Sequence, residues 1–271
     1  MNVWQIRVLF YGAIATPKSA ITPNLDSDLT LDWPYFGFLL QKDGRNILVD
    51  TGISDKFFID GKAWGGYPAY GGREYVEKAL DDIKVRPDNI EIVLYTHLHN
   101  DHAGNCTLFP KATHIAQRDE WKLLLDPLPI MNVRRDYDLD VIPGLMSLNL
   151  LKVDGDFRLT EGIWVYKTPG HTAGNQSVAV ETEKGIIVLV GDQWHINCMA
   201  FPDQTEIMDM FGKKHKITPA PAVYGPVIPS SLIYDYYDYY DSCYKIKAIA
   251  TADAPGFIIP GHEPSLMVTG V

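Results

Sequence analysis

The sequence is poor in cysteine, and its few thiols form no pattern. Cys106, Cys198 and Cys243 are the three cysteines of the 271-residue chain, and they lie far apart. An odd number without a Cys-x-x-Cys pair argues against a disulfide framework and against a thiolate zinc site. We therefore expect a protein of a reducing compartment, and the cytoplasm is the simplest assignment.

Long apolar runs are also missing. No stretch reaches the roughly 20 residues that a membrane-spanning helix needs. The segment from Met1 to Tyr11 mixes polar with apolar residues and lacks the basic start and cleavage site of a signal peptide. We expect this segment to form a first strand, and we expect no membrane as a partner.

Positive charge is scarce. The chain has 24 Lys and Arg against 34 Asp and Glu, which gives a formal net charge of −10. This surplus of acidic groups argues against nucleic acid and against an anionic lipid surface as partners. We expect the partner to be a neutral or weakly charged small-molecule substrate.

Apolar residues, by contrast, are plentiful, and their spacing predicts alternating elements. They make up 46% of the sequence, enough for a sizeable core, and no linker divides the chain, so we predict one domain over residues 1–271. Strands are predicted at 3–10, 36–40, 46–49, 90–95, 112–116, 148–153, 163–167, 176–180, 186–190 and 257–259. Helices are predicted at 74–84, at 118–125, and from Ser231 as N-cap to about Ala250.

Three segments are predicted to be irregular. Residues 53–75 form a long loop of the kind that often acts as a lid, and residues 126–146 and 218–231 are rich in proline. Strand-rich halves with interspersed helices indicate an α/β sandwich, with two mixed sheets face to face and helices outside.

The densest chemistry lies in residues 96–105, which read Thr-His-Leu-His-Asn-Asp-His-Ala-Gly-Asn at the end of an apolar strand. His97 and His99 are two residues apart, so on an extended segment both point to one face. Asp101 and His102 follow directly. Such crowding is unfavourable in a packed core unless each group has a partner, and a divalent cation is a suitable one. Four ligand groups along two directions suit two metals better than one.

Three further ligand-type residues stand at predicted strand ends. His171 follows Pro-Gly, Asp192 follows an apolar strand and a glycine, and His262 follows a second Pro-Gly. Strand ends at one edge of a sandwich are where functional sites assemble.

Together these segments resemble the signature of the metallo-β-lactamase superfamily. The turn Asp50-Thr51-Gly52 also resembles an early segment of that family. The resemblance implies an αββα sandwich with a dinuclear centre, holding two divalent ions: zinc, or else iron, manganese or cobalt. It further implies that one metal is held by His97, His99 and His171. The other metal would be held by Asp101, His102 and His262, and Asp192 would bridge the two.

The chemistry implied by this resemblance is metal-dependent hydrolysis. A hydroxide that bridges the metals would attack a carbonyl carbon, and Asp101 would handle the proton. The segments 97–105 and 169–177 are most similar to N-acyl homoserine lactonases, the quorum-quenching branch, and β-lactamases of this fold lack the bridging aspartate. The leading hypothesis is therefore the opening of a small cyclic ester or cyclic amide. The alternatives are a thioesterase of the glyoxalase II kind, a phosphodiesterase, and a non-hydrolytic iron protein.

One position departs from the lactonase pattern. Related lactonases usually have a tyrosine three residues after the bridging aspartate, and this chain has His195 there. We expect either a catalytic role, in which His195 donates a hydrogen bond to the substrate carbonyl or leaving group, or a packed histidine bonded to a carboxylate.

The remaining candidates have structural interpretations. We expect His114 and Cys106 to pack in the fold, His215 to lie in a solvated basic patch, and the tyrosines of 234–244 to form a core-facing helix surface. The aromatics of the early loops would line an apolar pocket, pack the loops or form a homodimer interface; they are Trp33, Tyr35, Phe57, Phe58, Trp64, Tyr67 and Tyr70.

Overall fold

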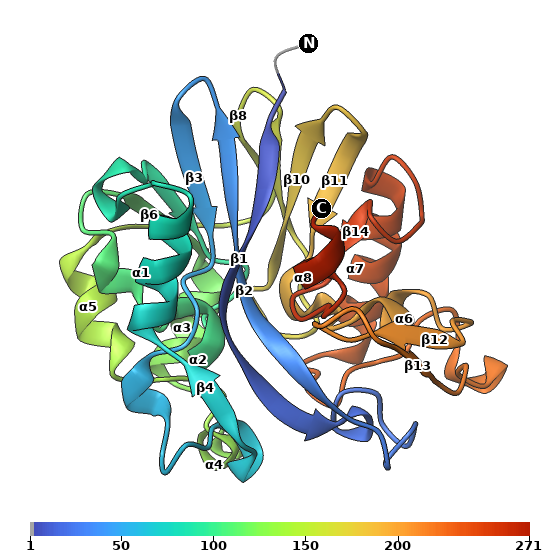
Figure 1. Ribbon diagram of the computed structural model, residues 1–271. Coiled ribbons are helices and arrows are strands. Elements are labelled where there is room, and N and C mark those ends of the chain that lie inside the picture. Colours follow the sequence, from blue (N-terminus) through green and yellow to red (C-terminus); the bar gives the residue numbers. More distant parts are fainter. Residues whose placement is uncertain (1–2) are drawn as a thin grey trace. The chain divides into compact units, whose positions relative to one another are not determined.

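The computed structural model describes residues 3–271, which divide into two compact units (Figure 1). The first unit comprises Met1–Ile14 and Tyr35–Gly155, and the second comprises Ala15–Pro34 and Asp156–Val271. Strands β1 (Gln5–Pro17) and β2 (Thr30–Lys42) belong to both units. Each unit therefore takes segments from two separate parts of the chain.

A seven-stranded mixed sheet runs through the first unit in the order β4-β1-β2-β3-β5-β6-β7. The β2–β3 hairpin is antiparallel, as the Asp43-Gly44 turn predicts, and β3, β5, β6 and β7 are parallel. The other strands are β3 (Arg45–Val49), β4 (Ala69–Gly71), β5 (Ile92–Leu94), β6 (Thr113–Gln117) and β7 (Asn149–Val153). Ile47, Leu48 and Val49 are fully buried, as expected for a central strand covered on both faces.

Helices of the first unit lie along this sheet (Figure 1). Their bounds are α1 (Arg73–Asp82), α2 (Asn100–Ala103), α3 (Arg118–Leu125), α4 (Pro129–Arg134) and α5 (Val141–Ser147). Helix α1 buries Val76 and Leu80, which are four residues apart, and α3 buries Trp121 and Leu124 at the same kind of spacing.

A five-stranded mixed sheet forms the second unit, in the order β14-β11-β10-β9-β8. Only the β11–β14 pair is parallel. The bounds are β8 (Phe157–Thr160), β9 (Ile163–Lys167), β10 (Gln176–Thr182), β11 (Gly185–Leu189), β12 (Glu206–Met208), β13 (Lys214–Lys216), β14 (Ile258–Ile259), α6 (Asn197–Ala200), α7 (Tyr236–Ile249) and α8 (Leu266–Thr269). The prediction of two mixed sheets with helices is confirmed.

Two predictions of local structure were wrong. Residues 126–146 contain α4 and α5, because Pro129 and Pro143 lie in the first turns of these helices, where a backbone N–H has no intrahelical partner to lose. The long C-terminal helix begins later than Ser231: Asp235 is its N-cap, and its carboxylate accepts the N–H groups of Tyr237 and Asp238.

Several side chains also differ from their predicted surroundings. Of the tyrosines on α7, Tyr239 is fully buried, whereas Tyr236, Tyr237 and Tyr244 are exposed, so the predicted core face is limited to one ring. His215 is paired with Asp209, with Nε2 and Oδ2 2.8 Å apart, and does not lie in a merely solvated basic patch.

Trp33 and Tyr35 lie in β2 and are buried, so they are core residues of a strand and not of the early loops. Phe57 is buried as well.

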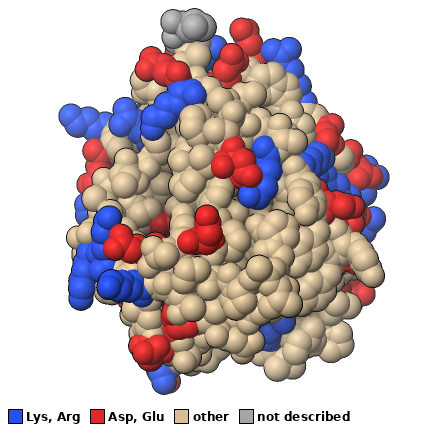
Figure 2. All heavy atoms as spheres, turned by 90° about the vertical axis from the view of Figure 1, so that its right-hand side faces the viewer, with Lys and Arg blue, Asp and Glu red and all other residues tan. Residues whose placement is uncertain are grey.

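Charged groups of both signs are interspersed on the face shown in Figure 2, and a broad area between them carries neither sign. Among residues 3–271 no helix is both long and apolar enough to cross a membrane.

Candidate metal centre

The first group of predicted ligands follows directly after β5, at the end of this strand. His97 and His99 flank the fully buried Leu98, and their Nε2 and Nδ1 atoms lie 3.1 Å apart. The His97 ring also lies against His102, with ring centroids 4.0 Å apart. The three rings are all buried, so the sequence prediction that they gather at one strand end is confirmed for this unit.

Asp50 is the acceptor that orients this group, although its place in the sequence predicts only a turn. Its Oδ2 is 2.8 Å from Nδ1 of His102 and accepts the Thr96 hydroxyl at 2.7 Å, while its Oδ1 accepts the Thr96 N–H at 2.8 Å. Because the carboxylate only accepts, His102 carries its proton on Nδ1 and presents the lone pair of Nε2. A carboxylate directly after a buried strand was the signal that could have identified Asp50.

Glu120 is a second functional residue that was not predicted from the sequence. This fully buried carboxylate on α3 accepts the Leu98 N–H at 3.0 Å and the Tyr137 hydroxyl at 2.9 Å. It therefore fixes the backbone between His97 and His99. A glutamate on the apolar side of an amphipathic helix was the available signal.

Gly104 and Asn105 hold the end of the ligand segment against the turn after Asp50. A Cβ at Gly104 would collide with the backbone of Gly52 and Ser54, so only glycine permits this approach. The Asn105 amide donates to the carbonyls of Thr51 and Ile53 at 3.0 and 2.8 Å.

In the second unit His171 lies in the loop between β9 and β10. Its Nδ1 is 2.9 Å from the carbonyl oxygen of Leu232, so Nδ1 holds the proton and Nε2 presents its lone pair. The loop is closed by Asn175, whose amide donates to the carbonyl of Thr168 at 3.0 Å.

Asp192 and His262 meet at the ends of β11 and β14. The parallel pairing of these strands places the two loops side by side, and the N–H of His262 donates to the carbonyl of His195 at 2.8 Å. His262 Nδ1 is 2.7 Å from the carbonyl of Pro34, and its Nε2 is 3.2 Å from the Asp192 carboxylate. A Cβ at Gly261 would collide with Oδ1 of Asp192, which explains the glycine of this Pro-Gly-His segment.

His195 contacts the same carboxylate. Its Nε2 lies 3.4 Å from Oδ2 of Asp192, while that of His171 lies 3.8 Å from the same oxygen. The His195 ring stacks on the His262 ring with centroids 5.5 Å apart. The predicted residue is therefore beside the ligand group of its own unit.

Glu263 supports the loop that carries His262. It is fully buried, and it accepts the N–H of Asn197 at 2.8 Å and the hydroxyl of Ser265 at 2.5 Å. Burial raises the pKa of its carboxyl above the ordinary value, although these hydrogen bonds oppose the shift.

Asp101 differs from the other predicted ligands because its side chain is partly exposed. Its Oδ1 lies 3.7 Å from Nε2 of His102. Burial, and secondly the negative charge of Asp101, raise the pKa of the Tyr35 hydroxyl well above 10. Tyr35 therefore stays neutral at physiological pH.

The donor atoms fit divalent metals of the zinc type. The imidazoles of His102, His171 and His262 all keep Nδ1 on an oxygen acceptor and present Nε2, the arrangement usual for metal-bound histidine. The 3.1 Å between His97 Nε2 and His99 Nδ1 is close to the roughly 3.3 Å expected for two nitrogens on one tetrahedral zinc.

The predicted ligands are therefore divided between the units: four in the first and three in the second, with His195 beside the latter. The first four are His97, His99, Asp101 and His102, and the others are His171, Asp192 and His262.

Comparison with known proteins gives a family match over most of the chain. The sequence model described as "Metallo-beta-lactamase superfamily" matches residues 32–262. An N-acyl homoserine lactonase of Bacillus cereus is 27% identical over 197 residues, which cover 70% of this chain and 75% of the relative. The N-acyl homoserine lactonase AttM of Rhizobium radiobacter is 28% identical over 188 residues, covering 65% and 70%.

Solved structures agree in fold. An N-acyl homoserine lactone hydrolase with the product N-hexanoyl-L-homoserine at its catalytic metal centre aligns with a TM-score of 0.73 at 23% identity, covering 97% of this chain and 94% of that chain. The dizinc quorum-quenching lactonase AidC aligns with a TM-score of 0.69 at 16% identity, covering 97% and 89%. These likenesses confirm the predicted fold class, the αββα sandwich of two mixed sheets with helices on the outer faces.

Proposed function

Because the chain belongs to the metallo-β-lactamase superfamily, we propose that it is a metal-dependent hydrolase that opens a small cyclic ester. The observation that carries this proposal is the donor chemistry of the two ligand groups. In both groups there are buried imidazoles, those of His102, His171 and His262, whose Nδ1 is already held by an oxygen, which leaves Nε2 as the metal-binding nitrogen.

We propose that the two groups act together on two divalent ions. His97, His99 and His171 would hold one ion, Asp101, His102 and His262 the other, and Asp192 would bridge them. The contacts of Asp192 with His262 and His171 in the second unit support this bridging position. Zinc is the proposed metal because imidazole and carboxylate suit it, and AidC is described as a dizinc enzyme. Iron, manganese and cobalt suit the same ligands.

Two bound ions would supply a nucleophile at neutral pH, by lowering the pKa of water, and a Lewis acid for the substrate carbonyl. The chain's own residues then move the proton. Asp101 is the partly exposed carboxylate among the predicted ligands of the first unit, so we assign it to take a proton from water and deliver it to the leaving oxygen.

His195 would assist at the substrate oxygen. Its carbonyl oxygen is occupied by the N–H of His262, and its ring is held between His171 and His262. A neutral imidazole in this position donates one hydrogen bond. A tyrosine hydroxyl has the same role in the lactonases that this sequence resembles.

The lactone class is favoured over the alternatives by similarity to relatives. The Bacillus cereus and Rhizobium radiobacter proteins are both named N-acyl homoserine lactonases. Glutathione thioesters and phosphodiesters carry more negative charge than a lactone, and the formal net charge of −10 does not favour them. The buried, unpaired state of all three thiols supports a reducing compartment, and we propose the cytoplasm.

A hydrolysis panel tests this function. The purified protein would be assayed on N-hexanoyl-homoserine lactone, γ-decalactone, ε-caprolactam, a glutathione thioester and bis(p-nitrophenyl) phosphate, and its metals would be measured by elemental analysis. We expect opening of the lactones, with metal present in the active protein. Activity confined to the thioester or the phosphodiester would refute the assignment.

A further inference from the structure

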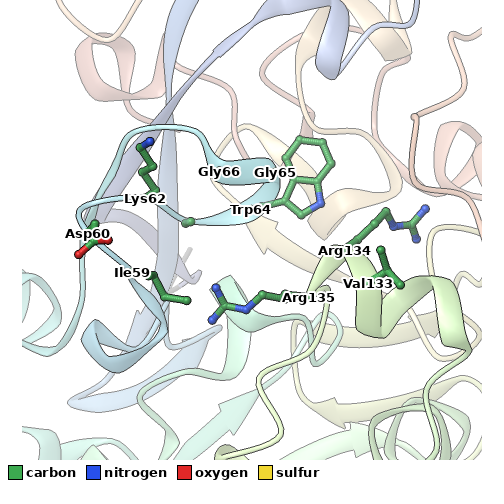
Figure 3. Close-up of a pocket in the computed structure, with 10 residues that line it drawn as sticks. Ile59, Asp60, Lys62, Trp64, Gly65, Gly66, Val133, Arg134 and Arg135 are labelled. Atoms are coloured by element: carbon green, nitrogen blue, oxygen red, sulfur yellow. The ribbon is translucent and has the colours of Figure 1, made fainter.

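A cavity of about 470 Å³ lies in the first unit, between the loop that follows Asp50 and the end of α4 (Figure 3). Its size is typical of pockets that bind small molecules. Ile59, Trp64 and Val133 contribute apolar groups to its wall, and Lys62, Arg134 and Arg135 contribute cations. The pocket therefore combines an apolar surface with a concentration of positive charge in a chain whose overall charge is negative.

Arg135 is the residue that gives the pocket its polarity. It ends α4 in a left-handed conformation with φ of 59°, which suits glycine better than a residue with a Cβ. Its guanidinium carbon lies 4.1 Å from the centre of the Phe57 ring, and one of its nitrogens donates to the carbonyl of Phe57 at 3.1 Å. In Figure 3 this side chain extends from the end of α4 toward Ile59.

The neighbouring charges leave Arg135 available to an anion. Arg134 is paired with the buried Asp136 at 2.6 Å, whereas Arg135 has no carboxylate within 4.0 Å among residues 3–271. Burial raises the pKa of Asp138, and the charge of Arg135 only partly opposes this shift. At the exposed rim Lys62 and Asp60 have opposite charges. The stacked guanidinium keeps its remaining N–H groups for a bidentate acceptor.

Trp64 adds a further donor. Its Nε1–H is buried and has no hydrogen-bond partner within residues 3–271. Its ring stacks on Tyr67 with centroids 6.2 Å apart, which fixes its orientation at the pocket wall. In Figure 3 the indole nitrogen lies on the side of Arg134, away from the Arg135 guanidinium.

The pocket is tied to the segment of metal-ligand residues by Asn100. The side-chain amide of Asn100 donates to the carbonyl of Arg135 at 2.8 Å, and Asn100 stands between His99 and Asp101. This hydrogen bond fixes the backbone of Arg135 beside the segment that carries the predicted ligands.

We propose that this cavity binds an apolar group that ends in a carboxylate. The apolar part contacts Ile59, Trp64 and Val133, and the carboxylate accepts from Arg135. Resting on the proposed function, we assign this group to the distal end of the lactone substrate, which makes the preferred substrate a lactone with an acidic tail.

Equilibrium binding tests the pocket without depending on hydrolysis. Isothermal titration calorimetry of the full-length, metal-loaded protein would compare 4-phenylbutyrate with its neutral isostere 4-phenylbutanamide. We expect the acid to bind at least about tenfold more tightly than the amide, as a charge-assisted pair would give. Equal affinity for the two compounds, or binding of neither, would overturn the proposal.

Substitutions then locate the site. Arg135→Met should weaken binding of the acid about ten- to hundredfold and leave the amide unchanged. Arg158→Met is the matched control, because Arg158 also lies over an aromatic ring, that of Trp164, but in the second unit. If acid binding survives Arg135→Met, the carboxylate binds elsewhere, for instance at the metals, and the proposal is refuted. If circular dichroism shows that Arg135→Met does not fold, Arg135→Lys is the variant to test, because it keeps the charge and loses the planar guanidinium. An unchanged affinity of Arg135→Lys for the acid would refute the site.

Kinetics test the assignment to the substrate. With lactones that carry either a terminal carboxylate or a terminal amide, Arg135→Met should raise KM for the acid alone and leave kcat unchanged. If the protein opens no lactone, the proposed function fails while the calorimetric result still decides the pocket.

Discussion

Asp50 is the residue on which the histidines of the first unit depend most. Its carboxylate accepts from Thr96 and from His102, with all three groups buried. Acceptors of this kind fix the tautomer and the ring orientation of a metal ligand, and their loss usually lowers metal affinity about 10- to 100-fold.

We therefore expect Asp50→Asn to bind zinc about 10- to 100-fold more weakly than the unmodified protein, as measured by competition with a chromophoric chelator. Asp209→Asn is a matched control, because Asp209 makes the same kind of pair with His215 outside the predicted ligands. Unchanged zinc affinity in Asp50→Asn would contradict the orienting role.

His195 allows a prediction that separates catalysis from metal binding. We expect His195→Ala to lower kcat for lactone opening about a hundredfold, the usual cost of removing one donor to a developing oxyanion, with metal content unchanged. His195→Tyr should recover much of the activity because a hydroxyl can donate in the same place. Full activity in His195→Ala would leave His195 with a packing role only.

At the scale of single residues, the sequence was informative about which residues are candidate ligands and silent about what orients them. His97, His99 and His102 could be predicted because three imidazoles within six residues at a strand end are typical of a metal site. Asp50 and Glu120 each had a local signal, a carboxylate after a buried strand and a glutamate on the apolar side of a helix. These signals do not say which groups the carboxylates hold, because their partners come from distant elements. The tautomers of the histidines likewise depend on hydrogen bonds to residues that are distant in the sequence.

At the scale of elements, the two ligand loops are held in the same way. Asn105 in His-Ala-Gly-Asn and Asn175 in His-Thr-Ala-Gly-Asn both use the side-chain amide to close the loop, by donating to carbonyls of the segment that precedes or faces the histidine. The sequence contained this repetition, but its physical meaning depended on the hydrogen bonds.

Strand and helix positions were predictable where apolar spacing was strong. The helix at 118–125 and the strand at 163–167 were predicted with the observed bounds. The three-residue strands β12 and β13 are too short for an alternation to be recognised, and α4 and α5 were obscured by prolines that in fact occupy first turns.

Gly261 provides a test of how an element positions a ligand. In Gly261→Ala the new methyl group would press on the Asp192 carboxylate, and overpacking of this kind costs about 1–3 kcal/mol. We expect Gly261→Ala to lose metal on gel filtration and to have a lower Tm than the unmodified protein. Gly225→Ala adds a methyl group into open space in the same unit. Because Gly225 has a φ of 88°, this variant should also lose stability through backbone strain, but its metal content should be normal. Normal metal content in Gly261→Ala would show that the loop tolerates displacement.

At the scale of the whole molecule, a buried ion pair supports folding of the second unit. The Lys18 ammonium is fully buried and lies 2.8 Å from Asp26, whose carboxylate also accepts from Thr218. Although burial alone would raise it, the hydrogen bonds from Lys18 and Thr218 lower the pKa of Asp26 below its usual 3.8. A depressed carboxyl pKa contributes stability that is present above the unfolded pKa and is lost as the pH falls through the folded pKa.

We expect Asp26→Asn to lower the free energy of unfolding at pH 7 by about 3–5 kcal/mol, because it leaves the buried Lys18 charge without an opposite charge and with only the Thr22 hydroxyl as acceptor. The variant with both Lys18→Met and Asp26→Asn should be more stable than Asp26→Asn alone, since it removes that charge. Urea denaturation at pH 7 measures both effects, and equal stability of the single and double variants would contradict this role of the pair.

The central claim is that seven side chains of this chain hold two divalent ions that enable lactone opening. The most direct measurement is a zinc titration of the chelator-stripped protein, with opening of N-hexanoyl-homoserine lactone followed by proton release after each addition. We predict no activity without metal and a rise in rate that ends at about two zinc ions per chain. Full activity of the stripped protein, or two bound zinc ions without lactone opening, would contradict the account.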